Sequence, residues 1–260
     1  MKKKSSSTRT RAHRPFIRAA ARTSVGKVRT NNEDTYGIDR RCGLYLVCDG
    51  MGGAAGGEVA SLMACRTATA SFAAQSIHSA TANAIEENLN AAFTAANSAV
   101  WREGRGDEHH NMGTTMVAAA IAGDTLVIGN VGDSRAYLLQ SQGWRQITTD
   151  HSYINELVRL GSIREEDVNA PELQRFGSII TRAIGAAEDI TPDFFHLKLH
   201  DGDAVLLCSD GLTRYLDAPQ FDNEIDLGDL DAACKHLCDL ANKLGGIDNI
   251  TCLLLRYHAE

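Results

Sequence analysis

The 260-residue sequence lacks any apolar run near the length of a membrane-spanning helix. No apolar stretch follows its basic N-terminus, so we do not expect a secretory signal. Its seven cysteines form no Cys-x-x-Cys motif, and most lie in apolar segments or on a helical face. These absences argue against disulfides and a zinc site, and they favour reduced core cysteines in a cytoplasmic protein.

Acidic residues are missing from the first 18 positions, which carry seven basic residues. Since the whole chain carries −7 and this segment carries +7, the remaining chain carries −14. An acidic body argues against nucleic-acid binding and is compatible with carboxylates gathered around metal ions. We expect residues 1–15 to be a disordered basic tail, with a docking arm for an acidic partner or membrane surface as the alternative.

The spacing of apolar residues predicts both kinds of secondary structure in the first two thirds of the chain. Early strands are expected at 16–25, 35–38 and 44–48, and helices at 57–75 and 81–103. Four short strands are expected at 116–121, 125–130, 135–139 and 144–148. Tight turns containing Gly or Asp join these four, which predicts an antiparallel meander.

Residues 150–180 form a polar segment with a short helix at 153–160, and we interpret it as a flap. Further elements are expected at 193–199, 204–208, 230–244 and 250–257. This order lacks regular βαβ alternation, so a doubly wound parallel sheet is disfavoured. It favours an α+β fold in which two antiparallel sheets pack face to face with helices outside. No linker or repeat divides the chain, so one domain is expected over 16–258.

Several acids follow apolar strands or stand in tight turns. Asp49 follows the apolar run 44–48 and precedes glycines, which let a backbone carbonyl such as that of Gly50 approach the same ion. The other acids of this kind are Asp133, Asp210, Asp248 and the loop pair Glu33-Asp34. Each alone is typical of an ordinary turn. Together at the ends of buried strands they are costly unless cations balance them.

Oxygen donors without a His/Cys set favour Mg²⁺ or Mn²⁺ over zinc. Two such ions about 3.5–4 Å apart can activate a water and clamp a phosphoryl group for in-line attack. Arg29 precedes Glu33 by four residues in the same loop. It can contact a phosphate through two hydrogen bonds, although a plain surface arginine is the alternative.

Eight motifs carry a resemblance to the metal-dependent protein phosphatases (PPM), the type 2C serine/threonine phosphatases, and most of all to their bacterial branch. They follow the family order between about residue 16 and residue 257. The motifs are RTNNED at 29–34, DGMGG at 49–53, GTT at 113–115, NVGDSRAY at 130–137, TDHS at 149–152, ITRAIG at 180–185, SDGLT at 209–213 and DNIT at 248–251.

The resemblance implies a four-layer α-β-β-α sandwich with two core Mn²⁺ or Mg²⁺ ions at one end. It implies that Asp49 bridges the ions, that the Gly50 carbonyl binds one, and that Asp210 and Asp248 complete the other. Glu33 and Asp34 would act through bound waters, and Arg29 would hold the substrate phosphate. Asp133 would bind a third ion with Asp210. The segment 150–180 would shape substrate access.

One position departs from many eukaryotic members of the family. Met51 stands where they have a histidine proposed as the general acid. A methionine cannot donate a proton, so a bound water or another group must serve. His151 is a candidate, with a structural histidine at the base of the flap as the alternative.

The implied activity is hydrolysis of phosphoserine and phosphothreonine in proteins, without a covalent enzyme intermediate. Such a phosphoric monoester hydrolase would act as a cytoplasmic monomer and oppose a bacterial Ser/Thr kinase. One alternative is the same chemistry on another phosphorylated regulator or a small phosphoester. A silent phosphoprotein-binding module is another, but it predicts missing metal-binding acids, and all of them are present.

Overall fold

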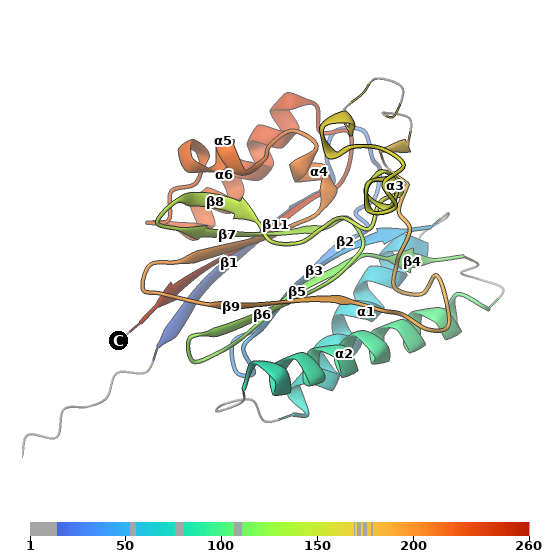
Figure 1. Cartoon of the computed structure of the whole chain (residues 1–260), viewed down its shortest axis with the longest axis horizontal. Helices are drawn as coiled ribbons and strands as arrows, with labels where there is room; N and C mark the ends of the chain where they lie inside the picture. Colours follow the sequence, from blue (N-terminus) through green and yellow to red (C-terminus); the bar gives the residue numbers. More distant parts are fainter. Residues whose placement is uncertain are drawn as a thin grey trace, which may run out of the picture.

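Two antiparallel β-sheets pack face to face, and helices cover both outer faces (Figure 1). The structure is a computed structural model, and it describes residues 15–52, 56–75, 81–106, 111–168, 170, 173, 176–177 and 179–259. The expected tail therefore lies, except for its last residue, outside the described residues, as do Gly53 and Pro171. No helix among the described residues has both the length and the hydropathy to cross a membrane.

One sheet has the strand order β1-β11-β10-β7-β8, and the other has the order β2-β3-β5-β6-β9 with β4 paired to β3. The strands of the first are β1 (Phe16–Ser24), β7 (Arg135–Gln140), β8 (Gly143–Gln146), β10 (Ala204–Cys208) and β11 (Ile250–His258). Those of the second are β2 (Asp34–Asp39), β3 (Leu44–Met51), β4 (Gly113–Thr114), β5 (Met116–Ala122), β6 (Thr125–Val131) and β9 (Asp193–Lys198).

The central strands are apolar on both sides because each sheet is covered twice. Tyr45 and Val47 of β3 face Leu207 and Leu253 of the opposite sheet across the inner core. The alternate residues of β3 pack under α1 (Gly56–Ala73) and α2 (Ala82–Glu103). The helices α4 (Asp210–Thr213), α5 (Ala218–Glu224) and α6 (Leu230–Leu244) cover the other sheet. These four layers confirm the predicted α+β sandwich.

The meander predicted over 116–148 is wrong. β5 and β6 pair in one sheet, whereas β7 and β8 pair in the other. The chain crosses between the sheets at residues 132–134, where Gly132 adopts a positive φ of 111°. Strand periodicity and turn residues indicate that strands consecutive in sequence run antiparallel. They do not indicate which sheet each strand joins. Asp133 lies at this crossing.

A second departure lies at 214–229, a polar acidic stretch between the expected elements 204–208 and 230–244 where the sequence predicts no helix or strand. It contains α5, whose first turn includes Pro219. Asp217 and Gln220 form a reciprocal capping box at its N-terminus. Asp followed three residues later by Gln is a helix-start signal that could have revealed this helix.

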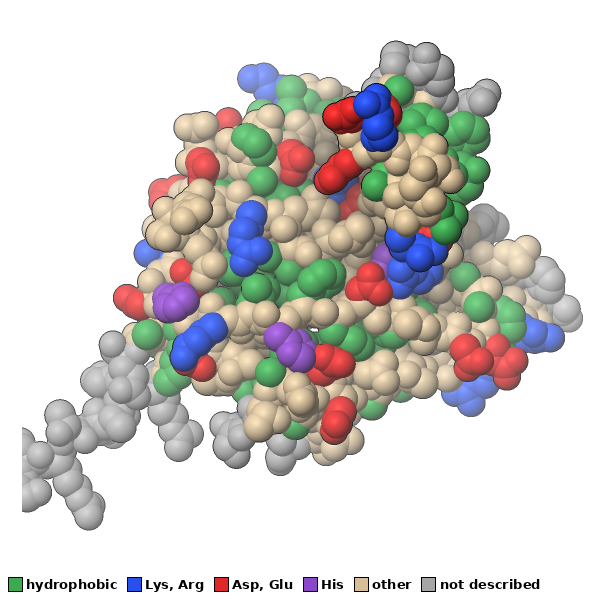
Figure 2. Space-filling model, viewed as in Figure 1, with side chains coloured by type: hydrophobic (Ala, Val, Ile, Leu, Met, Phe, Trp, Pro, Cys, Tyr) green, Lys and Arg blue, Asp and Glu red, His purple; other side chains and the backbone are tan. Residues whose placement is uncertain are grey.

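The segment between β8 and β9 contains α3 (Tyr153–Arg159) and the 3-10 turn η1 (Glu165–Asp167). Its two ends are held together, since Ser152 pairs with Ile180 and the Thr181 amide donates to the His151 carbonyl over 2.7 Å. Figure 1 places α3 and β4 at one end of the sandwich, opposite the end where the chain enters β1 and leaves β11. Charges of both signs are interspersed over the face in Figure 2, which leaves no broad basic surface there.

The close packing of α4 on the start of β11 depends on Gly211. A Cβ placed on Gly211 would lie 1.9 Å from the carbonyl oxygen of Asn249. Asp210 and Asp248 are the residues immediately before these two in the sequence. The absence of a side chain at Gly211 therefore sets how near the two predicted ligands can come.

Gly211→Ala is expected to destabilise the fold by about 3 kcal/mol or more, because two backbone segments must separate. Helix propensity alone would favour the alanine. The measurement is urea unfolding, with Gly123→Ala as control. Gly123 has a positive φ of 62° and open space around it, so its change should cost only about 1–2 kcal/mol. Equal costs for the two variants would contradict the packing argument.

Candidate metal centre

The pairing of β2 with β3 brings the first two carboxylates together. In this antiparallel register Asp34 is the partner of Asp49. The Gly50 amide donates to the Glu33 carbonyl over 3.0 Å, so the ladder continues past Asp49. The sequence suggested a turn directly after residue 48. β3 instead extends to Met51, because Gly50 and Met51 pair with β4. Asp49 therefore projects from a strand held on both sides.

Thr114 and Thr115 fix the backbone of Asp49. The Thr115 amide and the Thr114 hydroxyl both donate to the Asp49 carbonyl, each over 2.8 Å. The Asp49 amide donates in return to Thr115 Oγ1 over 3.0 Å. The hydroxyls of Thr115 and Ser134 also lie 2.7 Å apart, which links this node to the residue after Asp133. These bonds leave the Asp49 carboxylate to other partners.

Asp210 and Asp248 reach the same place from the opposite sheet. Asp210 begins α4 directly after β10, and Asp248 lies just before β11. Ser209 joins the two sheets here, since its hydroxyl donates to Asp34 Oδ2 over 2.8 Å and accepts from the Thr251 amide over 3.0 Å. The site thus lies where strands of both sheets end side by side.

Asn249 holds the loop that carries Arg29 and Glu33. Its side-chain amide donates to the carbonyls of Val25 and Asn31, each over 2.9 Å. Its side-chain oxygen accepts from the Glu33 amide over 2.8 Å. The loop is therefore anchored to the residue that follows Asp248, which brings all the acids of the two segments to one region.

Burial and mutual repulsion both act on these carboxylates. Burial raises the pKa of Asp49 well above its usual range, and the charges of Asp34, Asp210, Asp133 and Asp248 raise it further. Burial likewise raises the pKa of Asp34 to about 7, although the hydrogen bond from Ser209 lowers it in part. The pKa of Asp210 is also raised, first by burial. Several acids whose charges repel one another in a buried region call for positive charge.

Asp133 lies next to this cluster beside a cavity of about 230 Å³. Its neighbours around the cavity include Asp210, Arg214 and the pair Arg135 and Asp150. Burial raises the pKa of Asp133 to about 7, and the charges of Asp210 and Asp150 add to this effect. Asp133 and Asp210 are therefore close enough to repel each other, as a shared ion would require.

The residues present fit divalent ions of the Mg²⁺ or Mn²⁺ type. Asp34 Oδ1 is buried and has no hydrogen-bond partner among the described residues. A Cβ on Gly50 would lie 2.1 Å from the Gly57 carbonyl oxygen, and one on Gly57 would lie 2.5 Å from Glu33 Oε2. These two glycines let the Gly50 and Gly57 backbones and the Glu33 carboxylate pack closely together. Oxygen donors of this kind suit hard cations.

The acidic side chains of the cluster do not already form a complete set of metal ligands. Within the described ranges, no three His, Cys, Asp or Glu side chains already surround one point in the manner of a finished metal site. Two of the acids have other partners. Arg29 Nη2 donates to Asp248 Oδ2 over 2.9 Å, and Arg214 Nη2 donates to Asp210 Oδ2 over 3.1 Å. Arg29 thus lies beside the cluster, as expected, but paired with a predicted ligand.

His151 is a structural residue. Its Nδ1 accepts from the Gly132 amide over 3.1 Å, and its Nε2 lies 3.1 Å from Asp193 Oδ2. Burial lowers its pKa, which favours the neutral ring with the proton on Nε2. Both ring nitrogens have partners outside the proposed metal-binding cluster. The structural alternative therefore describes His151, and its main effect is to hold the turn before Asp133.

All seven cysteines are free and buried. Burial raises the pKa of Cys208, which lies two residues before Asp210 and packs in the core. A thiol of this kind does not provide a thiolate nucleophile. The prediction that the cysteines lie in the core is confirmed.

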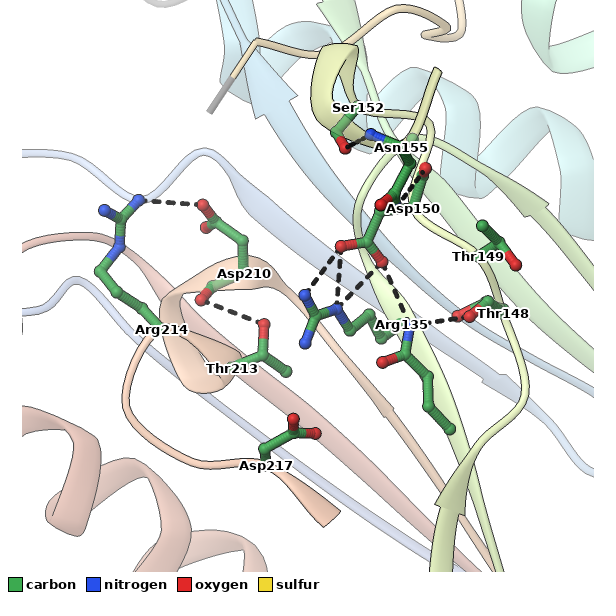
Figure 3. A network of polar contacts seen from close by, with 12 residues as sticks. Arg135, Thr148, Thr149, Asp150, Ser152, Asn155, Asp210, Thr213, Arg214 and Asp217 are labelled. Carbon is green, nitrogen blue, oxygen red and sulfur yellow. Dashed lines mark hydrogen bonds and ion pairs between the residues drawn. The ribbon is translucent and has the colours of Figure 1, made fainter. Parts of the chain in front are cut away.

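Sequence reasoning missed two charged contacts at the site. The first is the pair Arg135 and Asp150, joined by three hydrogen bonds of 2.8–3.1 Å (Figure 3). The second is Arg214 on Asp210. Arg135 lies within the motif at 130–137, and Arg214 directly follows the motif at 209–213. An arginine four residues after an acid in a helix is a recognisable ion-pair spacing.

Comparison with known proteins agrees with this geometry. A family model described as Protein phosphatase 2C matches residues 23–244. The chain belongs to the protein phosphatase 2C family. The serine/threonine phosphatase stp of Listeria innocua is 37% identical over 246 residues, which cover 92% of this chain and 95% of that protein.

Solved structures of the family superpose on this phosphatase 2C chain. The serine/threonine phosphatase PstP/Ppp of Mycobacterium tuberculosis gives a TM-score of 0.82 at 33% identity, covering 94% of this chain and 99% of that one. A PstP catalytic domain in complex with two manganese ions gives a TM-score of 0.80 at 31% identity, covering 94% and 100%. The predicted family, bacterial branch, fold and enzyme class, a protein serine/threonine phosphatase, are confirmed.

The raised pKa of Asp34 predicts a pH-dependent stability in the metal-free phosphatase. A folded-state pKa raised from 3.8 to about 7 means that the folded protein keeps a proton that the unfolded chain has lost. The stabilisation is therefore complete below the lower value and falls as the pH rises to about 7. Asp34→Asn has no carboxyl to lose this proton. The free energy of unfolding of the variant should therefore increase relative to that of the wild type by about 1.4 kcal/mol per pH unit between pH 3.8 and about 7.

The measurement is urea unfolding of both proteins in EDTA at several pH values between 4 and 8. The difference in unfolding free energy should rise across the window and level off above it. A difference that stays constant with pH would show that Asp34 is not held protonated.

Proposed function

We propose that the protein hydrolyses phosphoserine and phosphothreonine in proteins at the carboxylate cluster around Asp49. The observation that supports this most is the convergence on Asp49 of Asp34, Asp133, Asp210 and Asp248, whose charges all raise its pKa. Such a cluster is stable as carboxylates only with cations among them. We propose two core Mn²⁺ or Mg²⁺ ions, and a third beside Asp133.

The proposed ligand roles are those that the family resemblance implies, and the hydrogen bonds that hold Asp49 support them. Asp49, whose backbone is hydrogen-bonded to Thr114 and Thr115, would hold the core ions together with the Gly50 carbonyl, Asp210 and Asp248. Glu33 and Asp34 would hold them through bound waters. Ions bound there would supply the acidified water and the charge neutralisation that phosphoryl transfer requires.

Arg29 is the proposed phosphate-binding residue. Its side chain is about half exposed and touches Asp248 through one nitrogen. A guanidinium has further donors, and in a planar arrangement they suit two phosphate oxygens. Arg29 would thus orient the phosphoryl group toward the water while its loop stays anchored by Asn249.

Neither Met51 nor His151 is suited to give the leaving alcohol its proton. Met51 has no acidic proton, and both nitrogens of His151 are engaged by Gly132 and Asp193. We propose that a water in the open site donates this proton. Consequently no single side chain should control the acidic limb of the pH–rate profile through leaving-group protonation.

We further propose that the protein acts in the cytoplasm as a monomer on substrates of a cognate Ser/Thr kinase. Curated relatives carrying the serine/threonine phosphatase name support the substrate class. The interspersed surface charge on the face in Figure 2 supports the proposal that nucleic acid is not a partner.

Activity on a phosphothreonine peptide should require Mn²⁺ or Mg²⁺ and be abolished by EDTA. Asp49→Ala and Asp210→Ala should each lower kcat/KM by roughly 10³-fold or more, because each removes several kcal/mol of charge stabilisation. Asp124→Asn is the control, since this exposed carboxylate pairs with Lys198 on the surface. Activity that persists in EDTA and in both alanine variants would exclude the metal mechanism. Hydrolysis of p-nitrophenyl phosphate but not of the peptide would instead point to small phosphoesters.

Asp133→Ala should reduce catalysis while the two core ions still bind. The reason is that Asp133 borders the separate cavity shared with Asp210, whereas Asp49 and Asp248 remain in place. Calorimetric titration with Mn²⁺ should show loss of the weaker binding event alone. Loss of the core ions as well would contradict the assigned roles.

A further inference from the structure

Two arginines neutralise two acids of the cluster. Arg29 pairs with Asp248, and Arg214 pairs with Asp210, with distances of 2.9 and 3.1 Å. Arg214 is the C-cap residue of α4, four residues after Asp210, and its side chain is 37% exposed. Figure 3 shows its guanidinium reaching back to the Asp210 carboxylate. Arg214 is thus a cation whose partner is itself a proposed metal ligand.

The cavity beside Arg214 is also lined by Arg135, whose guanidinium already has hydrogen-bond partners. Arg135 gives Nε and Nη2 to Asp150, and its Nη1 donates to the Tyr137 hydroxyl over 3.2 Å. All three nitrogens of its guanidinium therefore have partners. Arg214 has one hydrogen bond to Asp210 and faces the same cavity. Of these two guanidiniums, Arg214 is the one able to accept a new anion.

Divalent ions would change the net charge of the residues that line this cavity. Asp133, Asp150 and Asp210 stand against Arg135 and Arg214, so carboxylates exceed guanidiniums by one when all are charged. An ion held by Asp133 and Asp210 would reverse the sign and compete with Arg214 for Asp210. The cavity would then attract an anion, and the freed donors of Arg214 would match a carboxylate.

We propose that Arg214 is a specificity-determining residue that binds a carboxylate side chain flanking the phosphorylated residue of the protein substrate. This inference rests on the proposed phosphatase function and deepens it. Arg29 orients the phosphoryl group at Asp248, and Arg214, which pairs with Asp210, selects the acidic neighbour. The favoured substrates are therefore phosphopeptides with Asp or Glu close to the phosphorylated residue.

The test compares three phosphothreonine peptides that carry Glu, Gln or Lys at the positions flanking the phosphorylated residue. The wild type should show kcat/KM for the Glu peptide about tenfold above that for the Gln peptide, as expected for a charged hydrogen bond. Arg214→Gln should bring this ratio close to one, and Arg214→Lys should keep part of it. Arg214→Glu should reverse the preference toward the Lys peptide, which a loss of folding cannot produce.

Arg41→Gln is the matched control because it removes the same charge from a side chain that is 91% exposed and pairs with Asp39. Its peptide ratio should equal that of the wild type. A ratio unchanged in Arg214→Gln and in Arg214→Glu would overturn the inference while leaving the phosphatase function intact. A wild type that hydrolyses none of the three peptides would overturn the proposed function, and this inference with it.

A second readout does not depend on turnover. If ions displace Arg214 from Asp210, removing the arginine should tighten Mn²⁺ binding by about two- to fivefold, the range expected for a partly exposed ion pair. Calorimetric titration of Arg214→Gln and wild type measures this directly. Equal Mn²⁺ affinities would overturn the competition between Arg214 and the ion.

Discussion

Electrostatic repulsion among carboxylates at the ends of buried strands is the constraint on which the rest of the structure depends. Asp34 and Asp49 are register partners on neighbouring strands, and Asp210 and Asp248 approach from the other sheet. Placing these charges together opposes folding. Hydrogen bonds of the surrounding structure hold them in place, and oxygens such as Asp34 Oδ1 have no protein partner among the described residues.

Protons and arginines moderate this repulsion in the metal-free protein. Asp34 and Asp133 retain protons up to about pH 7, mainly because they are buried. Arg29 and Arg214 neutralise Asp248 and Asp210. Each of these groups also defines what a bound ion must displace. The same balance of charges therefore affects both the stability of the protein and its affinity for metal ions.

Much of the fold and site followed from sequence because the acids mark strand ends and the helices show clear periodicity. The long helix at 230–244 and the paired strands at 204–208 and 250–257 were predicted nearly to the residue. The crossing at Asp133 was not, because local patterns carry no information about which sheet a strand joins. The short helix α5 was missed because its capping signal lay in an acidic stretch that suggested a loop.

The sequence by itself determined the family, the type of fold and the set of acids, since these depend on residue identity and order. Tertiary structure alone decided how the side chains are paired. It showed that His151 is engaged by Gly132 and Asp193, that Arg135 is committed to Asp150, and that Arg214 rests on Asp210. The partners of His151 and Arg135 are 15 to 42 residues apart in sequence and meet only when the chain folds, so these roles depend on contacts that no local pattern contains. The contact of Arg214 with Asp210 is local in sequence, but the cavity that both residues face forms only in the folded chain.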